Sequence, residues 1–267
     1  MFKRLLSHLL ISLAVFILTA TFFMWTVDSR VLEPGVLSGE LRKAGVSQEF
    51  ANLMPQIVTA ESDSSPVEKA EMAQKVSQAI TATYIDQKVA QISDSVLTFV
   101  KAGEPQPVID LSDFPNQLAS AGVEVGDDVN DKFDKPVQLN ENGNLDKVTK
   151  AYKIFGYIKY AGIALFAAIL LLEWYVSERG KKLRRVSRIF LYAGVSYLIY
   201  WGLLIAAPGR LATTLQKNVQ AEYDTTALID SVLKAFRGLF ASYFLSFALV
   251  CLGVALVLYI IRHYKHG

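Results

Sequence analysis

The chain has 267 residues, of which 52% are hydrophobic and 19% are charged, so it is more apolar than an ordinary soluble domain. Its net charge of +2 combines two unlike parts, because 19 acidic and 10 basic residues lie between Val31 and Lys150 and 6 acidic and 17 basic residues lie elsewhere. The single cysteine, Cys251, lies in the last apolar run, which excludes a disulfide bond in the acidic part. The sequence also contains no Asn-x-Ser/Thr site for N-glycosylation. The lack of such sites and the lack of disulfide bonds in the acidic part favour a prokaryotic source.

The first apolar run covers residues 5–27 and follows a short basic segment, residues 1–4. About 20 apolar residues in a helix span the hydrocarbon core of a bilayer, so this run predicts a transmembrane helix. A cleaved signal peptide is the alternative, but its apolar region is shorter and ends at a small-x-small site. Here the bulky residues Phe22 to Trp25 follow Ala20. An uncleaved anchor is therefore the preferred interpretation.

Residues 28–153 have the composition of a soluble domain, and helical spacing of apolar residues dominates them. Short helices are predicted over residues 37–43 and 48–60. Ser65-Pro66-Val67-Glu68 combines a capping serine, a proline at the first helical position and a glutamate at the third, which is a capping box. Apolar residues then recur at three- and four-residue steps as far as Gly103. This pattern predicts two amphipathic helices or one long bent helix.

The region from Pro105 to Asn144 has weaker patterns. Two prolines predict an extended segment, Pro107 to Leu111, and a short helix is expected over residues 114–121. Four apolar residues are candidates for a small β-hairpin: Val123, Val125, Val137 and Leu139. The acidic run 126–134 and the segment from Asn140 suggest calcium, but neither has the residue order of a calcium-binding loop, so we predict solvated loops and no metal site.

A helix predicted from Leu145 continues into the second span, residues 154–176, and further spans are predicted over residues 189–207 and 238–261. The loop between the second and third spans, residues 177–188, contains six basic residues: Arg179, Lys181, Lys182, Arg184, Arg185 and Arg188. Basic residues in short loops stay on the cytoplasmic side. This predicts a multi-pass protein of the plasma (inner) membrane with both termini, residues 1–4 and 262–267, in the cytoplasm. Residues 28–153 and 208–237 are then extracytoplasmic.

The six basic residues are therefore determinants of topology. They are also candidates for contact with anionic lipids or with a cytoplasmic partner. Small residues at Ala161-Gly162 and Ala193-Gly194 predict close helix approach, which packing within one chain explains, although self-association as a homo-oligomer stays open.

Two ionisable residues, Lys159 and Glu173, lie within the second span, each a few residues from one of its boundaries. Such groups are functional candidates. Near a boundary they can extend to the headgroups, which is the preferred interpretation here. An ion pair with a neighbouring helix and a role in transport are the alternatives. No acid, base or amide lies near the middle of any span, which argues against a proton-coupled transporter with ligands at the midplane.

No catalytic or cofactor-binding motif is found. The three histidines, His8, His263 and His266, lie on the predicted cytoplasmic side. The outer domain therefore contains neither histidine nor cysteine, which excludes a Ser-His-Asp site, a Cys-His site and an ordinary histidine-containing zinc site there. A Ser-Lys hydrolase or a paired-carboxylate glycosidase stays open. We expect no cofactor and no nucleic-acid partner.

The segment from Tyr84-Ile85-Asp86 to Lys101-Ala102-Gly103, continued by Pro107-Val108-Ile109-Asp110-Leu111-Ser112, resembles a pattern in uncharacterised four-span bacterial envelope proteins. In those proteins an outer helix ends in a glycine and an extended stretch follows. The resemblance implies no activity. The order of spans is also similar to that of permease subunits of the cell-division and macrolide-export type, whose large outer domain follows the first span. Here four residues of the sequence precede that span, so we expect no cytoplasmic helix that could couple to an ATPase.

The expected fold is an all-α membrane protein with four transmembrane helices and a mostly helical extracytoplasmic domain. We expect a scaffold, sensor or accessory subunit that contacts the lipid bilayer and binds an envelope or extracellular protein partner through its outer domain. The alternatives are a transporter or channel subunit, including a permease-like partner of an ATPase, and a membrane-anchored hydrolase.

Overall fold

The computed structural model describes residues 2–60, 65–123, 135–206, 214 and 224–266. The chain divides into two compact units. The first, here called the apolar unit, comprises Met1–Val31, Lys153–Ala207 and Leu239–Gly267. The second, here called the polar unit, comprises Leu32–Tyr152 and Pro208–Gly238. Two helices, α8 (Asn144–Val176) and α11 (Thr226–His266), contribute residues to both units.

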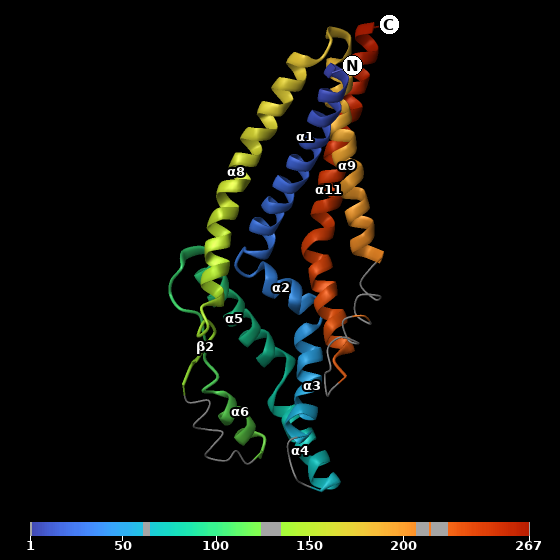
Figure 1. Ribbon diagram of the computed structural model, residues 1–267. Helices are drawn as coiled ribbons and strands as arrows, with labels where there is room; N and C mark the ends of the chain where they lie inside the picture. The colour runs from blue at the N-terminus through green and yellow to red at the C-terminus, as the bar shows by residue number, and fades with distance from the viewer. Residues whose placement is uncertain (1, 61–64, 124–134, 207–213, 215–223, 267) are drawn as a thin grey trace. The chain divides into compact units, whose positions relative to one another are not determined.

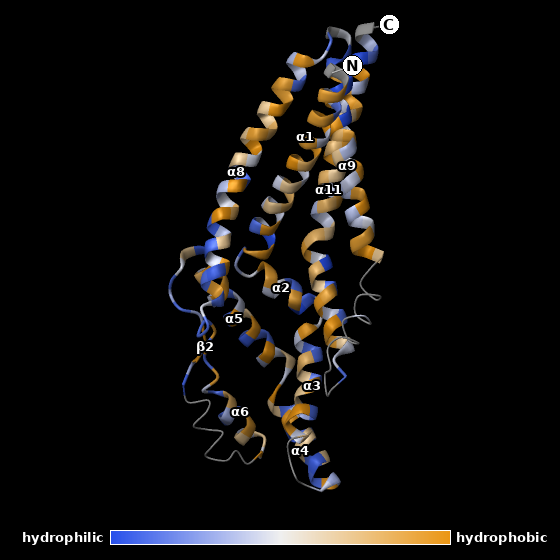
Figure 2. Cartoon of the chain, in the orientation of Figure 1, coloured by the Kyte–Doolittle hydropathy of each residue, from blue (hydrophilic) through white to orange (hydrophobic). Residues whose placement is uncertain are grey.

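Four long helices run alongside one another in the apolar unit (Figure 1). They are α1 (Phe2–Thr26), the later part of α8, α9 (Lys182–Ala206) and the later part of α11. A short π-helical turn, η1 (Val27–Val31), follows α1. Figure 2 shows hydrophobic residues along all four helices. Each helix is long and apolar enough to cross a membrane, which agrees with the four predicted spans.

The start of α1, the turn between α8 and α9, and the end of α11 lie together at one end of the apolar unit, here called the α8–α9 end (Figure 1). A buried aliphatic cluster near this end joins α1, α8 and α9: Leu10, Ile11, Ala14, Ile17, Ile169 and Ile189. A second cluster is centred on Tyr197 of α9, whose ring lies edge-on to Phe247 of α11 with 4.8 Å between centroids. The Tyr197 hydroxyl donates to the carbonyl of Thr19 in α1 at 2.7 Å.

Two glycines allow close contact between these helices. A Cβ atom at Gly194 would lie 2.9 Å from Cγ of Leu252 and 3.1 Å from the carbonyl oxygen of Ala248, both in α11. A Cβ atom at Gly162 of α8 would overlap the side chain of Thr21 in α1. The close approach predicted from Ala161-Gly162 and Ala193-Gly194 is therefore confirmed at the glycine of each pair.

Among its described residues the polar unit contains five shorter helices: α2 (Val36–Lys43), α3 (Val46–Ala60), α4 (Pro66–Ala79), α5 (Ala82–Ala102) and α6 (Phe114–Ser120). The predicted capping box is confirmed, because the backbone N–H of Ser65 donates to Glu68 at 2.8 Å and the backbone N–H of Glu68 donates to Ser65 Oγ at 3.4 Å. Of the two alternatives for the following stretch, two helices are correct, since α4 ends at Ala79 and Thr81 caps α5.

The core of the polar unit is formed by apolar residues that recur at helical spacing, including Ala51 of α3, Val76 of α4 and Ile85 of α5. Gly103 ends α5 with φ of +88°, a left-handed conformation that glycine adopts without the steric cost of a Cβ atom. The position of this helix end was predicted from the sequence.

The small sheet differs from the predicted hairpin. Strand β2 (Val137–Gln138) pairs antiparallel with β1 (Val108–Ile109), which lies in the segment predicted to be extended. Val123 is not in a strand, and its backbone N–H donates to the carbonyl of Leu118 at the end of α6. Val125 and the acidic run 126–134 lie outside the described residues. The hairpin between residues 123 and 139 is therefore a wrong prediction, because the partner of Val137 comes from before α6.

The predicted loop over residues 177–188 is shorter than expected. Residues 179–181 form a 3₁₀ turn, η2 (Arg179–Lys181), and α9 begins at Lys182. The last four basic residues of the cluster therefore lie in the first two turns of a helix. In contrast, α8 is one unbroken helix from Asn144, so the predicted continuity from Leu145 into the second span is confirmed.

Candidate functional site

A buried carboxylate lies at the α8–α9 end of the apolar unit. Glu173 of α8 is fully buried, and its Oε1 atom accepts hydrogen bonds from Ser7 of α1 at 2.7 Å and from Ser177 at 2.9 Å. Arg185 of α9 forms an ion pair with the same oxygen, with Nη1 at 3.2 Å. The other oxygen, Oε2, is buried with no hydrogen-bond partner among the described residues. Glu173 therefore connects three helices through one oxygen atom.

This arrangement corrects the expectation that Glu173 extends to the headgroups. The side chain is directed into the bundle because α9 supplies the cation, and only 13% of the Arg185 side chain is exposed. Burying a carboxylate is unfavourable unless it is paired and hydrogen-bonded, and here both conditions hold. The alternative of an ion pair with a neighbouring helix is the correct one for Glu173.

Two partners of Glu173 were not identified from the sequence. Ser177 follows Glu173 by four residues, and this spacing places both on one helix face. The sequence alone could therefore have indicated a contact between them. Ser7 is 166 residues away from Glu173, and no local pattern connects them.

The other members of the basic cluster have different surroundings. Lys181 pairs with Glu178 at 2.5 Å. The ammonium group of Lys182 lies 5.2 Å from the centre of the Trp174 ring, a cation–π contact. The structure places Arg179 in the η2 turn but does not describe its side chain. Arg184 and Arg188 have no ion pair among the described side chains.

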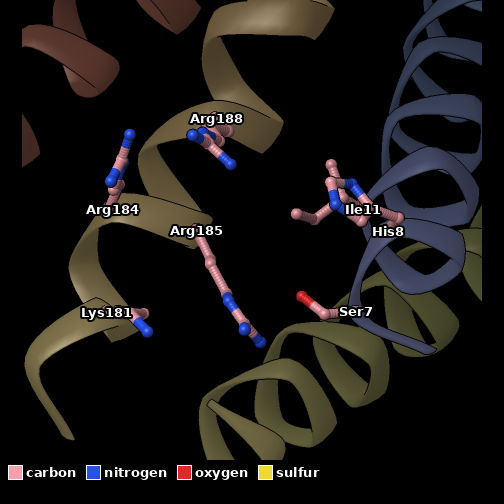
Figure 3. Close-up of a pocket in the computed structure, with 7 residues that line it drawn as sticks. All are labelled: Ser7, His8, Ile11, Lys181, Arg184, Arg185 and Arg188. Atoms are coloured by element: carbon pink, nitrogen blue, oxygen red, sulfur yellow. The ribbon is translucent and has the colours of Figure 1, made fainter. Parts of the chain in front are cut away.

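A cavity of about 180 Å³ lies between α9 and α1 at this end of the apolar unit. On the side of η2 and α9 it is lined by four cations: Lys181, Arg184, Arg185 and Arg188. The α1 side contributes Ser7, His8 and Ile11. Figure 3 shows Arg185 and Arg188 extending from α9 towards the space in front of the α1 residues. The cavity therefore has one strongly basic wall and one wall that is partly polar and partly apolar.

Lys159 takes part in a separate ion pair. Its ammonium group lies 2.5 Å from Asp28 in η1, the turn that follows α1. The rings of Trp25 and Tyr160 lie 5.3 and 5.1 Å from the same ammonium group. Only 12% of the Lys159 side chain is exposed, so the ion-pair alternative describes Lys159 as well. The partner Asp28 was not identified from the sequence.

In the polar unit a recess of about 400 Å³ lies between α2 and α5. It is open at Gly39 of α2, where an added Cβ atom would meet nothing within 4 Å. Arg42 of α2 and Asp86 and Gln87 of α5 line it. Asp86 is held in place by Ser47 of α3, whose hydroxyl donates to it at 2.5 Å. The recess thus presents a cation, a carboxylate and an amide. Because Gly39 has no side chain, the space next to the backbone of α2 stays open.

A polar cluster elsewhere in this unit joins α5 to the segment before α6. Lys88 pairs with Asp113 at 2.7 Å and donates to the carbonyl of Asp110 at 2.8 Å. Burial and the adjacent Asp113 carboxylate raise the pKa of Tyr84 above its ordinary value. Hydrogen bonds from Ser112 lower the pKa of Asp110. The Ser112 hydroxyl donates to Asp110 at 2.7 Å, so its proton is directed to a carboxylate, which is not the pairing of a Ser-Lys hydrolase.

Histidine, cysteine and acidic side chains do not converge as a metal site anywhere in the described part of the chain. The described side chains His8 and His263 belong to different helices, α1 and α11. The chain matches no protein-family model, no curated protein and no solved structure among those with which it was compared.

Proposed function

We propose that this chain is a multi-pass membrane scaffold, sensor or accessory subunit whose polar unit lies outside the cytoplasm and binds an envelope or extracellular partner. Four apolar helices of membrane-spanning length support the membrane location. The basic residues at the α8–α9 end favour a cytoplasmic position for that end and for both termini, in a plasma (inner) membrane. On this topology the residues of the polar unit lie outside the cytoplasm.

The recess between α2 and α5 is the observation that carries the proposed binding role. Its two charged residues, Arg42 and Asp86, have opposite sign, and Gln87 adds a donor and an acceptor. A polar segment of a partner protein matches such a surface, since it presents both charges and backbone hydrogen-bonding groups. The absence of a side chain at Gly39 lets the partner approach the backbone of α2.

The packing of the apolar unit supports a scaffold more than a conduction path. The ring of Phe22 in α1 stacks on Phe247 of α11 with 3.7 Å between centroids, and Tyr197 of α9 packs against both. These aromatic side chains occupy the space between three helices. The two ion pairs within the unit, Glu173 with Arg185 and Lys159 with Asp28, lie towards its ends. A path for ions through the bundle is lined by polar groups along its length. Here aromatic side chains lie between the two ion pairs, so the packing favours a scaffold.

Photo-crosslinking in intact cells tests the binding role. A benzophenone amino acid replaces Gln87, which lines the recess, and in a matched control it replaces Gln78, an exposed residue of α4 outside the recess. We expect a discrete protein adduct from position 87 and none from position 78. Gly39→Phe places a ring at the recess from a position where the Cβ atom meets nothing within 4 Å, and it should abolish the adduct. Adducts of equal yield at both positions, or adducts to lipid alone, would contradict the proposal.

A further inference from the structure

The cavity between α1 and α9 has more positive charge in its lining than the neighbouring carboxylates Glu173 and Glu178 balance. Of its four cations, Lys181 is paired with Glu178 and Arg185 with Glu173. Arg184 and Arg188 have no acidic partner among the described side chains. Two positive charges around this cavity are therefore uncompensated within the described part of the chain.

The spacing of these cations concentrates the charge on one side of the helix. Arg184, Arg185 and Arg188 lie within two turns of α9, and Lys181 is in the η2 turn directly before it, so four cations follow one another at intervals of three, one and three residues. Like charges at such positions repel and destabilise a helix. The first turn of α9 contains no acidic residue, and the positive end of the helix dipole adds to the same field. An anion in the cavity would relieve this repulsion.

The size and walls of the cavity define the anion. Guanidinium groups bind phosphate oxygens in a bidentate manner, and Arg184 and Arg188, which have no acidic partner among the described side chains, both line the cavity (Figure 3). A volume of about 180 Å³ accommodates a phosphate group with attached atoms, since a cavity of about 10–15 Å³ in the same measure already holds one water. Ile11 adds an apolar surface on the opposite wall. A phosphate attached to an apolar group matches both walls better than a free ion.

We infer that this cavity binds the phosphate of an anionic phospholipid headgroup, held chiefly by Arg184 and Arg188. The site lies at the end of helices that are long enough to span a bilayer, which is the level of the headgroups. Basic pockets between helices on the cytoplasmic side bind such headgroups. The inference depends on the proposed membrane location but not on the proposed outer partner. The crosslinking experiment can therefore fail while the lipid site stands.

Lipid binding to the full chain, purified in a neutral detergent, is measured by native mass spectrometry. The probes are phosphatidylglycerol and phosphatidylcholine with identical acyl chains. We expect the wild type to prefer phosphatidylglycerol. In Arg184→Gln/Arg188→Gln its affinity should fall about 25-fold, because each of two cations contributes about fivefold. The control Lys182→Gln/Arg262→Gln removes the same charge outside the cavity lining and should change the affinity less than about twofold.

Each other outcome contradicts the inference. Equal affinity of the wild type for the two lipids would exclude an anion-selective cavity, and this comparison needs no variant to fold. Equal losses in the two double variants would show non-specific attraction of charge. Inorganic phosphate is the third probe, and if millimolar phosphate displaced the lipid completely, the ligand would be a soluble phosphate compound and not a headgroup.

Discussion

At the scale of single residues, Glu173 shows how one buried charge can organise the end of a helix bundle. Its Oε1 atom accepts from serines on both sides of it in the chain and is paired with Arg185 of the next helix. A buried ion pair adds little net stability over apolar residues of the same volume, but removing one partner leaves an uncompensated charge. The network therefore favours this one arrangement of α1, α8 and α9 over alternatives.

Comparing a single variant with a double variant tests the role of this pair. Arg185→Met should lower the free energy of unfolding by about 3–5 kcal/mol, because Glu173 then stays buried without its cation. Glu173→Leu combined with Arg185→Met should restore most of the loss, because no charge remains buried. The measurement is thermal unfolding of the full chain in detergent. Lys182→Met serves as the control, and a double variant no more stable than Arg185→Met would show that the pairing does not matter.

The capping box makes a pH-dependent prediction at the same scale. Hydrogen bonds from Ser65 lower the pKa of Glu68 below its ordinary value of 4.5. A carboxyl with a lowered pKa stabilises the folded state above its unfolded pKa, and this contribution is lost as the pH falls through the folded pKa. The first turn of α4 should therefore lose hydrogen-exchange protection below about pH 4.5.

Glu68→Gln should remove this pH dependence, because the amide oxygen can still accept from Ser65 but does not titrate. Glu71→Gln, which removes the same charge at an exposed position of the same helix, should leave it intact. The measurement is amide hydrogen exchange of the full-length variants between pH 3 and 7, corrected for the intrinsic exchange rate. An unchanged profile in Glu68→Gln would rule out the cap as the source.

At the scale of secondary-structure elements, glycine positions determine how closely the apolar helices pack. Gly194 and Gly202 lie in the same helix, α9, yet only Gly194 faces a close neighbour. An added Cβ atom there meets Leu252 and Ala248, whereas one at Gly202 meets nothing within 4 Å. The two residues have equal intrinsic helix propensity, so they form a matched pair.

Gly194→Val should lower the free energy of unfolding by about 1–3 kcal/mol through overpacking against α11. Gly202→Val adds the same atoms in open space and should cost less. Thermal unfolding in detergent measures both. If the two variants have the same midpoint, the contact between α9 and α11 does not limit stability.

At the scale of the whole molecule, the distribution of charge along the chain is the main indication of topology. The acidic residues are concentrated between Val31 and Lys150, and the basic cluster lies at the α8–α9 end of the apolar unit. Translocating such a basic cluster is disfavoured. The proposed location of the polar unit outside the cytoplasm depends on this argument.

Cysteine labelling in spheroplasts tests this orientation. Gln74→Cys places a thiol on an exposed position of α4, and Lys181→Cys places one beside the basic cavity, both in a Cys251→Ala background. With an impermeant maleimide applied to spheroplasts, we expect labelling of position 74 at once and of position 181 only after permeabilisation. The reverse pattern would invert the topology and remove the basis of the proposed function.

Local patterns allowed much of the fold to be predicted. The start of α4 follows from Ser65 and Glu68, and the end of α5 follows from Gly103, because capping groups lie within a few residues of the helix ends that they satisfy. The extent of the basic turn was predicted less well. Lys182 to Arg188 were expected in a loop because their charge interrupts the apolar pattern, but lysine and arginine are good helix formers, and α9 includes them.

The sequence by itself determined the four apolar helices, the separation of charge along the chain and the helices of the polar unit, since all of these depend on composition or on neighbours three or four residues apart. Only the tertiary structure decided that Glu173 meets Ser7 and Arg185, that Lys159 meets Asp28 and that Val137 pairs with Ile109. The physical reason is that the direction of a side chain near a helix end depends on the rotation of that helix about its axis. That rotation is set by packing against segments distant in the chain.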